Sequence, residues 1–419
     1  MTFNWIILAL VSATVTLGDA VDDKGIVEET RLQEAGMYLY WQAQLPLAPG
    51  DSIDKGFLVD NALYVTTHNG TVFALDSKTG LLHWGEKVAK PNYTIYAPSH
   101  IRMPDDAGPV IIPTTTEVLV FDRFSGDRLK RFVRPFPAGS AAIATGDEIF
   151  MGSTDRKFYS LGVNVAHDIA PIKRWEVLTG GPITATPLLY SNRSLVFASQ
   201  DGTIYSCLTD DKTLLWSHRT SGPIVGDPVA DSGGVYVASM DRTVYKLHPR
   251  SGRVLWQKML SRPLSEGPVL AAHTLFQYSS DDGLVALDAD SGKEKWRLPA
   301  GRKFVAHNRK GDVILTTNRR LLWVDNETGD VLVTLETHGL AGVVSNTRDD
   351  ALFLLGRSGL VECARVDTTP YLRRQRILAS RNRLHLPSIN KNAATGDKTD
   401  AIGAAKKPTA KDPLRSRRD

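Results

Sequence analysis

Six of the eight tryptophans in this 419-residue chain recur at an interval of about forty residues. The intervals between successive members are 43, 91, 41, 40 and 40 residues, and the interval of 91 corresponds to two repeats. The six are Trp41, Trp84, Trp175, Trp216, Trp256 and Trp296. A period of about forty residues with strand-like flanks indicates a radial array of repeats rather than one enzyme-like core.

The same turn precedes the tryptophan in several repeats. Asp76 and Gly80 stand before Trp84 at the offsets at which Asp288 and Gly292 stand before Trp296. Partial copies of the turn are Gly252 before Trp256, and Asp325 with Gly329. The aspartate accepts backbone N–H groups in the turn, and glycine tolerates the positive φ where the chain reverses. We interpret the tryptophans as structural, each covering a neighbouring repeat with its N–H free to reach a carbonyl, rather than as an aromatic ligand cage.

The clearest repeat covers residues 222–258 and predicts four strands. Short runs of Val, Tyr, Thr and Leu between Asp and Gly turns are strand and hairpin signals. The expected strands are residues 224–230, 235–238, 243–247 and 253–258. Four antiparallel strands in forty residues are the content of one propeller blade, as in WD40-like repeats.

A proline marks the first strand of several repeats. These prolines are Pro98, Pro187, Pro228 and Pro268. Because proline cannot donate to a sheet ladder, it suits the beginning or the unpaired side of a strand. The innermost strand of a blade offers such a position.

Counting the second strand of each repeat gives eight units. These strands are expected near Leu63, Val110, Ile149, Leu195, Val235, Leu275, Val313 and Leu352. The outer strands reach the same number only if residues 38–45, around Trp41, complete the last unit. Closure from the other terminus removes an exposed sheet edge. We therefore predict an all-β fold, an eight-bladed β-propeller of four-stranded antiparallel blades closed by an N-terminal strand.

Three repeats depart from the pattern. The second has Lys130 at the tryptophan position with Phe132 nearby, the third is stretched through residues 163–173, and the seventh has Val333 in place of tryptophan. Either these blades have drifted, or they mark a face shaped for a partner.

The two ends of the chain differ from the repeats. Residues 1–20 resemble a secretory signal, with an apolar run from Trp5 to Leu17 followed by small residues. An uncleaved anchor is the alternative, but the run is short for a membrane span of about 20 residues. Residues 371–419 carry a net charge of +9, which leaves the rest at about −5. We expect a signal peptide at 1–20, a lead segment at 21–37, the propeller at 38–378 and a basic disordered tail at 379–419.

Residues of the kinds used in catalysis do not assemble into a known motif. The two cysteines, Cys207 and Cys363, fall in different repeats, and we expect both to be buried free thiols. Ten histidines are scattered without metal-binding spacing. The acidic stretches 281–283 and 288–290 are interpreted as turn residues rather than calcium ligands.

The A-x-D-x-x-T-G-x-x-x-W stretches resemble the tryptophan-docking motif of quinoprotein-type β-propellers, the pyrroloquinoline-quinone repeat superfamily. The resemblance covers roughly residues 38–366. The superfamily includes quinone-dependent alcohol dehydrogenases and non-catalytic members such as the propeller lipoprotein of the outer-membrane β-barrel assembly machinery. The dehydrogenases commonly carry a disulfide between adjacent cysteines, which this sequence does not contain, and no lipidation cysteine follows the apolar run.

The resemblance favours a non-catalytic, exported protein-interaction scaffold of the periplasm or cell envelope, with outer-membrane protein assembly as the implied process. We expect no enzymatic activity, no cofactor and no metal. The alternative is a quinone-dependent dehydrogenase-like protein, or a protein that binds a quinone or another small ligand.

Two groups of basic residues are candidates for partner binding. Arg302, Lys303 and His307 precede an inner strand and suit an acidic partner, or else belong to a solvated loop. In the tail, the candidates for contact with anionic lipid, cell-wall polymer or an acidic protein are Lys406, Lys407, Arg417 and Arg418. A solvated tail is the alternative, and we expect no nucleic-acid partner.

Overall fold

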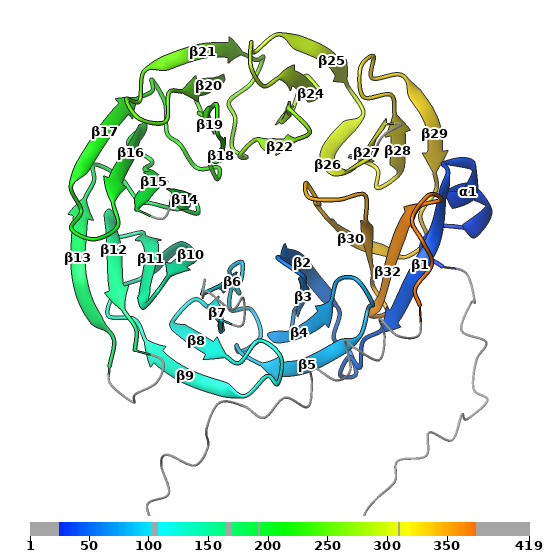
Figure 1. Ribbon diagram of the computed structural model, residues 1–419, viewed down its shortest axis with the longest axis horizontal. Coiled ribbons are helices and arrows are strands. Elements are labelled where there is room, and N and C mark those ends of the chain that lie inside the picture. The colour runs from blue at the N-terminus through cyan, green and yellow to red at the C-terminus, as the bar shows by residue number, and fades with distance from the viewer. Residues whose placement is uncertain (1–24, 102–107, 165–169, 192, 309–310, 374–419) are drawn as a thin grey trace, which may run out of the picture. The chain divides into compact units, whose positions relative to one another are not determined.

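Eight four-stranded antiparallel sheets form a ring in the computed structural model (Figure 1), which confirms the predicted fold class. The structure describes residues 25–101, 108–164, 170–191, 193–308 and 311–373. The chain divides into two units, residues 1–385 and 386–419. The predicted signal peptide and basic tail lie outside the described residues, as do residues 374–378 of the predicted propeller domain.

Seven blades are each built from four consecutive strands. The strands of blades 1 to 4 are β2 (Ile53–Val59), β3 (Ala62–Thr67), β4 (Thr71–Asp76), β5 (Leu82–Lys87); β6 (Ser99–His100), β7 (Val110–Pro113), β8 (Glu117–Phe121), β9 (Arg128–Val133); β10 (Ala138–Thr145), β11 (Glu148–Ser153), β12 (Lys157–Gly162), β13 (Ile172–Leu178); and β14 (Leu188–Ser191), β15 (Ser194–Ala198), β16 (Thr203–Leu208), β17 (Leu214–Arg219).

The strands of blades 5 to 7 are β18 (Val229–Asp231), β19 (Gly234–Ala238), β20 (Thr243–Leu247), β21 (Val254–Met259); β22 (Val269–Ala271), β23 (Thr274–Ser279), β24 (Gly283–Asp288), β25 (Glu294–Leu298); and β26 (Gly301–Asn308), β27 (Gly311–Thr316), β28 (Leu321–Val324), β29 (Val331–Leu335). In each blade the first strand is innermost and the fourth lies on the rim (Figure 1). All eight expected second-strand positions fall in or at the start of second strands.

Blade 8 joins the two ends of the ring. It contains β30 (Leu340–Val344), β31 (Leu352–Gly356) and β32 (Leu360–Val366), and its outer strand is β1 (Met37–Gln44). β1 pairs antiparallel with β32, from Met37 opposite Val366 to Gln44 opposite Leu360. The predicted closure by an N-terminal strand is confirmed.

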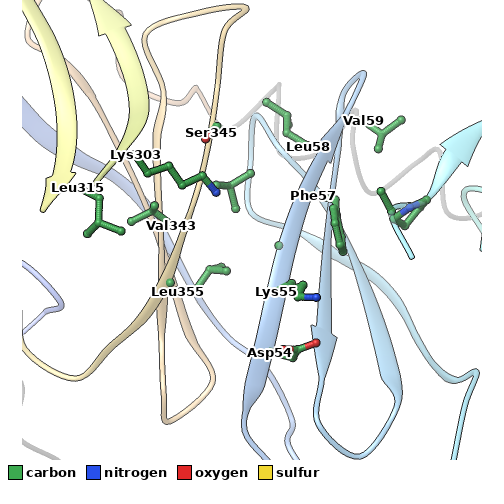
Figure 2. Close-up of a pocket in the computed structure, with 15 residues that line it drawn as sticks. Asp54, Lys55, Phe57, Leu58, Val59, Lys303, Leu315, Val343, Ser345 and Leu355 are labelled. Atoms are coloured by element: carbon green, nitrogen blue, oxygen red, sulfur yellow. The ribbon is translucent and has the colours of Figure 1, made fainter. Parts of the chain in front are cut away.

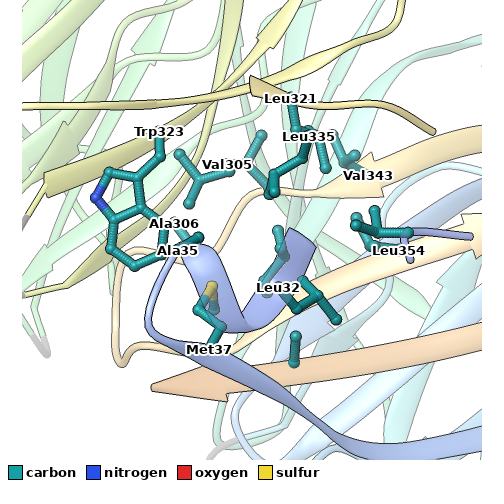
Figure 3. Close-up of a cluster of buried hydrophobic side chains, with 14 of the residues drawn as sticks. Leu32, Ala35, Met37, Val305, Ala306, Leu321, Trp323, Leu335, Val343 and Leu354 are labelled. Atoms are coloured by element: carbon teal, nitrogen blue, oxygen red, sulfur yellow. The ribbon is translucent and has the colours of Figure 1, made fainter. Parts of the chain in front are cut away.

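The described chain ahead of β1, residues 25–36, packs against blades 7 and 8. The backbone N–H of Ile26 donates to both carboxylate oxygens of Glu362 at 3.1 Å. The segment contains the helix α1 (Glu29–Glu34), whose buried Leu32 belongs to the same hydrophobic cluster as Trp323 and Leu335 (Figure 3). Blade 7 has Val333 at the tryptophan position, so this segment supplies the apolar cover that the repeat does not.

Each repeat tryptophan is bound to the following blade. Its indole N–H donates to a backbone carbonyl in the turn between the third and fourth strands of the neighbour, at 2.8 to 3.2 Å. The pairs are Trp41–Ser77, Trp84–Arg123, Trp175–Thr209, Trp216–Pro249, Trp256–Ala289 and Trp296–Asn326. Five of the six side chains are buried, and that of Trp256 is half-buried. The six rings therefore pack and hydrogen-bond between blades.

The glycine of the turn lies directly against the tryptophan of the preceding blade. A Cβ atom at Gly80 would lie 2.4 Å from Trp41, and one at Gly292 would lie 2.6 Å from Trp256. Both glycines have positive φ, +69° and +70°. Gly126, Gly252 and Gly329 repeat this arrangement. Glycine is therefore required at this position for two reasons, the positive φ of the backbone and the close approach of the indole ring.

Lys130 takes over the hydrogen bond of the missing tryptophan in blade 2. Its side chain is only 7% exposed, and its Nζ donates to the carbonyl of Asn164 at 2.7 Å. Asn164 occupies the turn position of blade 3 that the indoles contact in other blades. The junction thus keeps the donor while it loses the aromatic surface.

A second repeated network links the blades at the other end of the strands. The Ser199 hydroxyl donates to the carbonyl of Gly181, and the Ser239 hydroxyl donates to that of Gly222. Asp241 accepts the backbone N–H groups of Thr243 and Ser221. These bonds tie the turn between the second and third strands of a blade to the connection that enters the same blade from the preceding one.

The innermost strand of blade 5 is shorter than the sequence predicts. Residues 224–230 were expected to form one strand, but β18 begins at Val229. A Cβ at Gly226 would lie 2.1 Å from the backbone nitrogen of Gly267. The backbone segments that lead into blades 5 and 6 therefore touch before β18 begins. The four marker prolines each stand immediately before an innermost strand, β6, β14, β18 or β22, as expected for a residue without a backbone donor.

Candidate interaction site at the centre of the ring

The first cavity at the centre of the ring is lined by residues of blades 7, 8 and 1, together with Ala97 and Pro98 from the chain that enters blade 2. It has a volume of about 600 Å³ and is lined mainly by apolar residues, among them Phe57, Leu315 and Val343 (Figure 2). Asp54, Lys55 and Lys303 supply the charged groups of its wall. We call it the first central cavity.

The second central cavity lies between the innermost strands of blades 5, 6 and 7. Its volume is about 740 Å³, and its wall includes Phe276 and Tyr278 as well as Asp227 and Glu266. Both cavities are lined by Lys303 and Leu315, which stand opposite each other across β26 and β27. One pair of neighbouring side chains therefore separates the two cavities.

Arg302 is fully engaged in the wall of the second central cavity. Its Nη1 donates to Oε2 of Glu266 at 2.7 Å, its Nη2 donates to Oε1, and its guanidinium lies 4.0 Å from the centre of the Tyr278 ring. The hydrogen bonds to Glu266 raise the pKa of Arg302. Because both carboxylate oxygens bind Arg302, this pair is a bidentate clamp between blades 6 and 7.

Lys303 differs sharply from its neighbour. Its side chain is exposed to the cavities, and its amine has no ion pair or side-chain hydrogen bond within the described part of the chain. The surrounding walls of the ring nevertheless keep much of the bulk water away, and this desolvation lowers the pKa of Lys303. At its centre the ring thus holds an amine that no carboxylate of the described residues binds, although the charge of Glu266 acts on it.

Asp227 completes the charged groups of the second central cavity. Its Oδ1 accepts the backbone N–H of Thr186 from the preceding blade at 2.6 Å. Burial by the surrounding strands raises the pKa of Asp227. This carboxylate therefore holds two blades together and is a weak counter-charge for a ligand.

His307 lies in a different place from Arg302 and Lys303. It lines a third cavity, of about 790 Å³, and its Nδ1 lies 2.7 Å from Oδ1 of Asp312, which is buried. The expectation of one basic loop cluster was wrong. All three residues belong to β26, whose two register shifts turn its side chains toward separate surfaces.

Sequence reasoning missed Asp227, Glu266 and Tyr278. The sequence did contain a signal for the two acidic residues. Asp227 directly precedes Pro228, and Glu266 precedes Pro268 by two positions, so both residues lie just before an innermost strand. The tail candidates Lys406, Lys407, Arg417 and Arg418 lie outside the described residues.

The acidic stretches and the cysteines occupy structural positions. Asp282 accepts the backbone N–H of Ser261 at 2.8 Å, and Asp288 accepts that of Ser291 at 2.8 Å, both in turns. Cys207 and Cys363 are buried free thiols, as expected, and burial raises the pKa of Cys207 to about 12.

The described residues contain neither a cluster of metal ligands nor a membrane-spanning helix. In the ranges that the structure describes, no three His, Cys, Asp or Glu side chains lie together as metal ligands would. Within the same ranges, no helix has the length and apolar character needed to cross a membrane.

Comparison with known proteins supports the fold. The family model described as "Outer membrane protein assembly factor BamB" matches residues 172–260 and 241–368. The crystal structure of BamB from Moraxella catarrhalis is similar at 16% identity with a TM-score of 0.63, covering 80% of this chain and 99% of that one. The computationally designed Ika8 protein is similar at 14% identity and a TM-score of 0.59, covering 77% and 98%. No curated protein sequence gives a significant match. The chain is therefore a β-propeller whose fold is similar to that of BamB, and the matched part of its sequence is similar to the BamB family model.

Proposed function

We propose that this chain is a non-catalytic, exported scaffold that binds protein partners in the cell envelope. The observation that carries the proposal is the ring itself, in which bound tryptophans, Lys130 and the N-terminal segment fix neighbouring blades to each other. A stiff frame presents its loops and central wall in fixed positions, which suits recognition of other proteins. The match to a family described as an outer-membrane assembly factor favours the envelope as the place of action.

The engagement of the charged residues supports a non-catalytic role. Asp282 and Asp288 are bound in turns, and Glu266 is bound to Arg302. General acid–base catalysis needs a titratable group within hydrogen-bond reach of a substrate. These three carboxylates already accept hydrogen bonds that hold the ring together.

In-cell crosslinking followed by affinity purification and mass spectrometry tests the scaffold proposal. We expect full-length protein to capture envelope assembly proteins reproducibly. A tagged, exported protein of unrelated fold serves as the control bait. Capture of the same set by both baits, or of cytoplasmic proteins only, contradicts the proposal.

We further propose that the basic tail adds contact with an anionic surface. A Lys or Arg near an anionic membrane contributes about 1 kcal/mol, so the net positive charge of residues 371–419 supports such contact. Deletion of residues 388–419 is expected to move the protein from the membrane fraction to the supernatant. Unchanged sedimentation contradicts tail anchoring and leaves the scaffold proposal standing.

Small-ligand binding is the second candidate function. The two central cavities, about 600 and 740 Å³, have the size of small-molecule sites. Titration with pyrroloquinoline quinone, with and without Ca²⁺, tests it through quenching of tryptophan fluorescence. Saturable quenching at micromolar quinone supports this candidate, and a linear inner-filter response rejects it.

A further inference from the structure

The two central cavities meet at an amine that has no ion pair among the described residues. Lys303 lines both cavities, and both oxygens of the adjacent Glu266 are occupied by Arg302. Figure 2 shows the Lys303 side chain extending from β26 toward the strand that carries Val343. An amine that faces a cavity partly shielded from bulk water favours a carboxylate partner, since a charged hydrogen bond is stronger than a neutral one.

The walls on either side of Lys303 are mainly apolar. Phe57, Leu355 and Val343 line the first central cavity, and Phe276 and Val269 line the second. The remaining charges are Lys55 with Asp54 in the first cavity, and Asp227 in the second. A ligand that fits both cavities therefore carries an anionic group at its middle and apolar groups on each side.

The central wall also offers backbone hydrogen-bonding groups. β2, β22, β26 and β30 each stand at the end of their sheet, so one edge of each strand has no neighbouring strand in its own blade. The described residues place a single bridge between β26 and the chain after β30, at Ala306 and Asn346. Strand edges with alternating apolar pockets are the features by which extended peptides are recognised.

We propose that the centre of the ring binds an extended peptide segment of a partner protein, which places a glutamate or aspartate carboxylate on the Lys303 amine and apolar side chains in the two central cavities. This inference rests on the proposed scaffold function, since it names the chemistry of the partner. The free strand edges favour a peptide over a small carboxylate, because a small molecule would leave these edges to water.

Fluorescence anisotropy with defined peptides tests the proposal. The probe is a labelled nine-residue peptide with a central glutamate flanked by alternating valine and threonine. The control peptide has the same sequence with glutamine at the centre. We expect the glutamate peptide to bind wild-type protein, and Lys303→Met to weaken it by about tenfold or more, as the loss of a charged hydrogen bond predicts. Lys303→Arg retains the charge and is expected to restore most of the affinity.

The matched control is Lys293→Met, which removes the same charge from an exposed turn of blade 6. We expect it to bind the glutamate peptide as wild type does. Equal binding to wild type and Lys303→Met overturns the proposal, as does equal affinity for the glutamate and glutamine peptides. Saturable binding of octanoate with no measurable peptide binding also overturns it, because the occupant is then a small carboxylate.

The test is separable from that of the proposed function. If Lys303→Met captures the same envelope proteins as wild type by crosslinking, the scaffold proposal stands and the peptide site at the ring centre does not. If neither protein captures envelope proteins while the glutamate peptide still binds through Lys303, the peptide site stands and the scaffold proposal fails.

Discussion

A single missing Cβ atom decides how closely neighbouring blades approach. At Gly292 the backbone lies under the Trp256 ring, and at Gly80 it lies under Trp41. In both cases the indole N–H then reaches a carbonyl of the same turn. The tryptophan and the glycine therefore act as one contact, although they lie in different repeats.

Gly292→Ala separates the two reasons for glycine when it is compared with Gly339→Ala. Both residues have positive φ, but a Cβ at Gly339 meets nothing within 4 Å. We expect Gly339→Ala to lower the free energy of unfolding by about 1 kcal/mol, from backbone conformation alone. Gly292→Ala should cost about 1–3 kcal/mol more, because the methyl group displaces the Trp256 ring. Urea unfolding measures the free energy of unfolding of both variants. Equal losses would show that the Trp256 side chain moves aside without cost.

Lys130→Met tests whether the lysine bond holds blades 2 and 3 together. The substitution keeps the aliphatic length but leaves the Asn164 carbonyl without this donor, so we expect a loss of about 1–3 kcal/mol. Lys78→Met, in an exposed turn, is the control and should change stability little. Thermal unfolding measures both variants, and equal unfolding temperatures of Lys130→Met and Lys78→Met would contradict this role for Lys130.

At this scale the sequence predicted the tryptophan contacts correctly, because ring and turn recur together. The substitute role of Lys130 was not predictable, since a lone lysine in a strand looks solvated. Only the position of the Asn164 carbonyl shows why that lysine is buried.

Among the elements, the N-terminal segment has the most specific attachment. Ile26 binds the buried carboxyl of Glu362, and His338 donates its backbone N–H to the Ile26 carbonyl at 2.8 Å. Leu32 of α1 fills the junction of blades 7 and 8 (Figure 3). The segment therefore closes the one inter-blade junction of the described ring where Val333 replaces tryptophan.

Glu362 makes the attachment of this segment pH-dependent. Burial raises the pKa of Glu362 above its ordinary value of 4.5. As pH rises through that value the unfolded chain releases its proton first, so the folded state loses relative stability until Glu362 also ionises. We expect the free energy of unfolding of wild type, minus that of Glu362→Gln, to fall as pH rises from about 4.5 toward neutrality. Urea unfolding at stepped pH measures it, and a constant difference would contradict the burial of a titrating carboxyl.

The strand pattern was predictable for the second, third and fourth strands, where Val and Tyr alternate between turn signals. The first strand of blade 5 was overestimated, because the contact between blades at Gly226 and Gly267 precedes it. The site residues in β26 were assigned to a loop for a related reason. Charged side chains in an innermost strand face the centre of the ring, and a single repeat does not reveal that centre.

The ring as a whole depends on β1. A chain that begins at residue 46 would leave β32 as an exposed edge strand and remove the N-terminal segment as well. We expect this truncation to unfold at much lower urea concentration and to self-associate, whereas a chain that begins at residue 25 should behave as wild type. Size-exclusion chromatography and limited proteolysis give the comparison. Equal protease resistance of the two truncations would show that closure by β1 is dispensable.

The number of blades and the manner of closure were predictable, because both follow from counting repeats. The central cavities were not, since their walls come from innermost strands of three different blades. Lys303 stands out only when Glu266 is seen to be occupied by Arg302, a pairing between residues 36 positions apart.

The register of β1 against β32 also determines how the ring responds to mechanical force. Met37 lies opposite Val366, so the chain enters and leaves this strand pair at the same end. Tension between the two termini, once it has detached residues 25–36, would pull the strands apart like a zipper, breaking hydrogen bonds one after another toward Gln44 and Leu360. A protein held at both ends would thus open at blade 8 under a small load, while the other seven blades carry none of it.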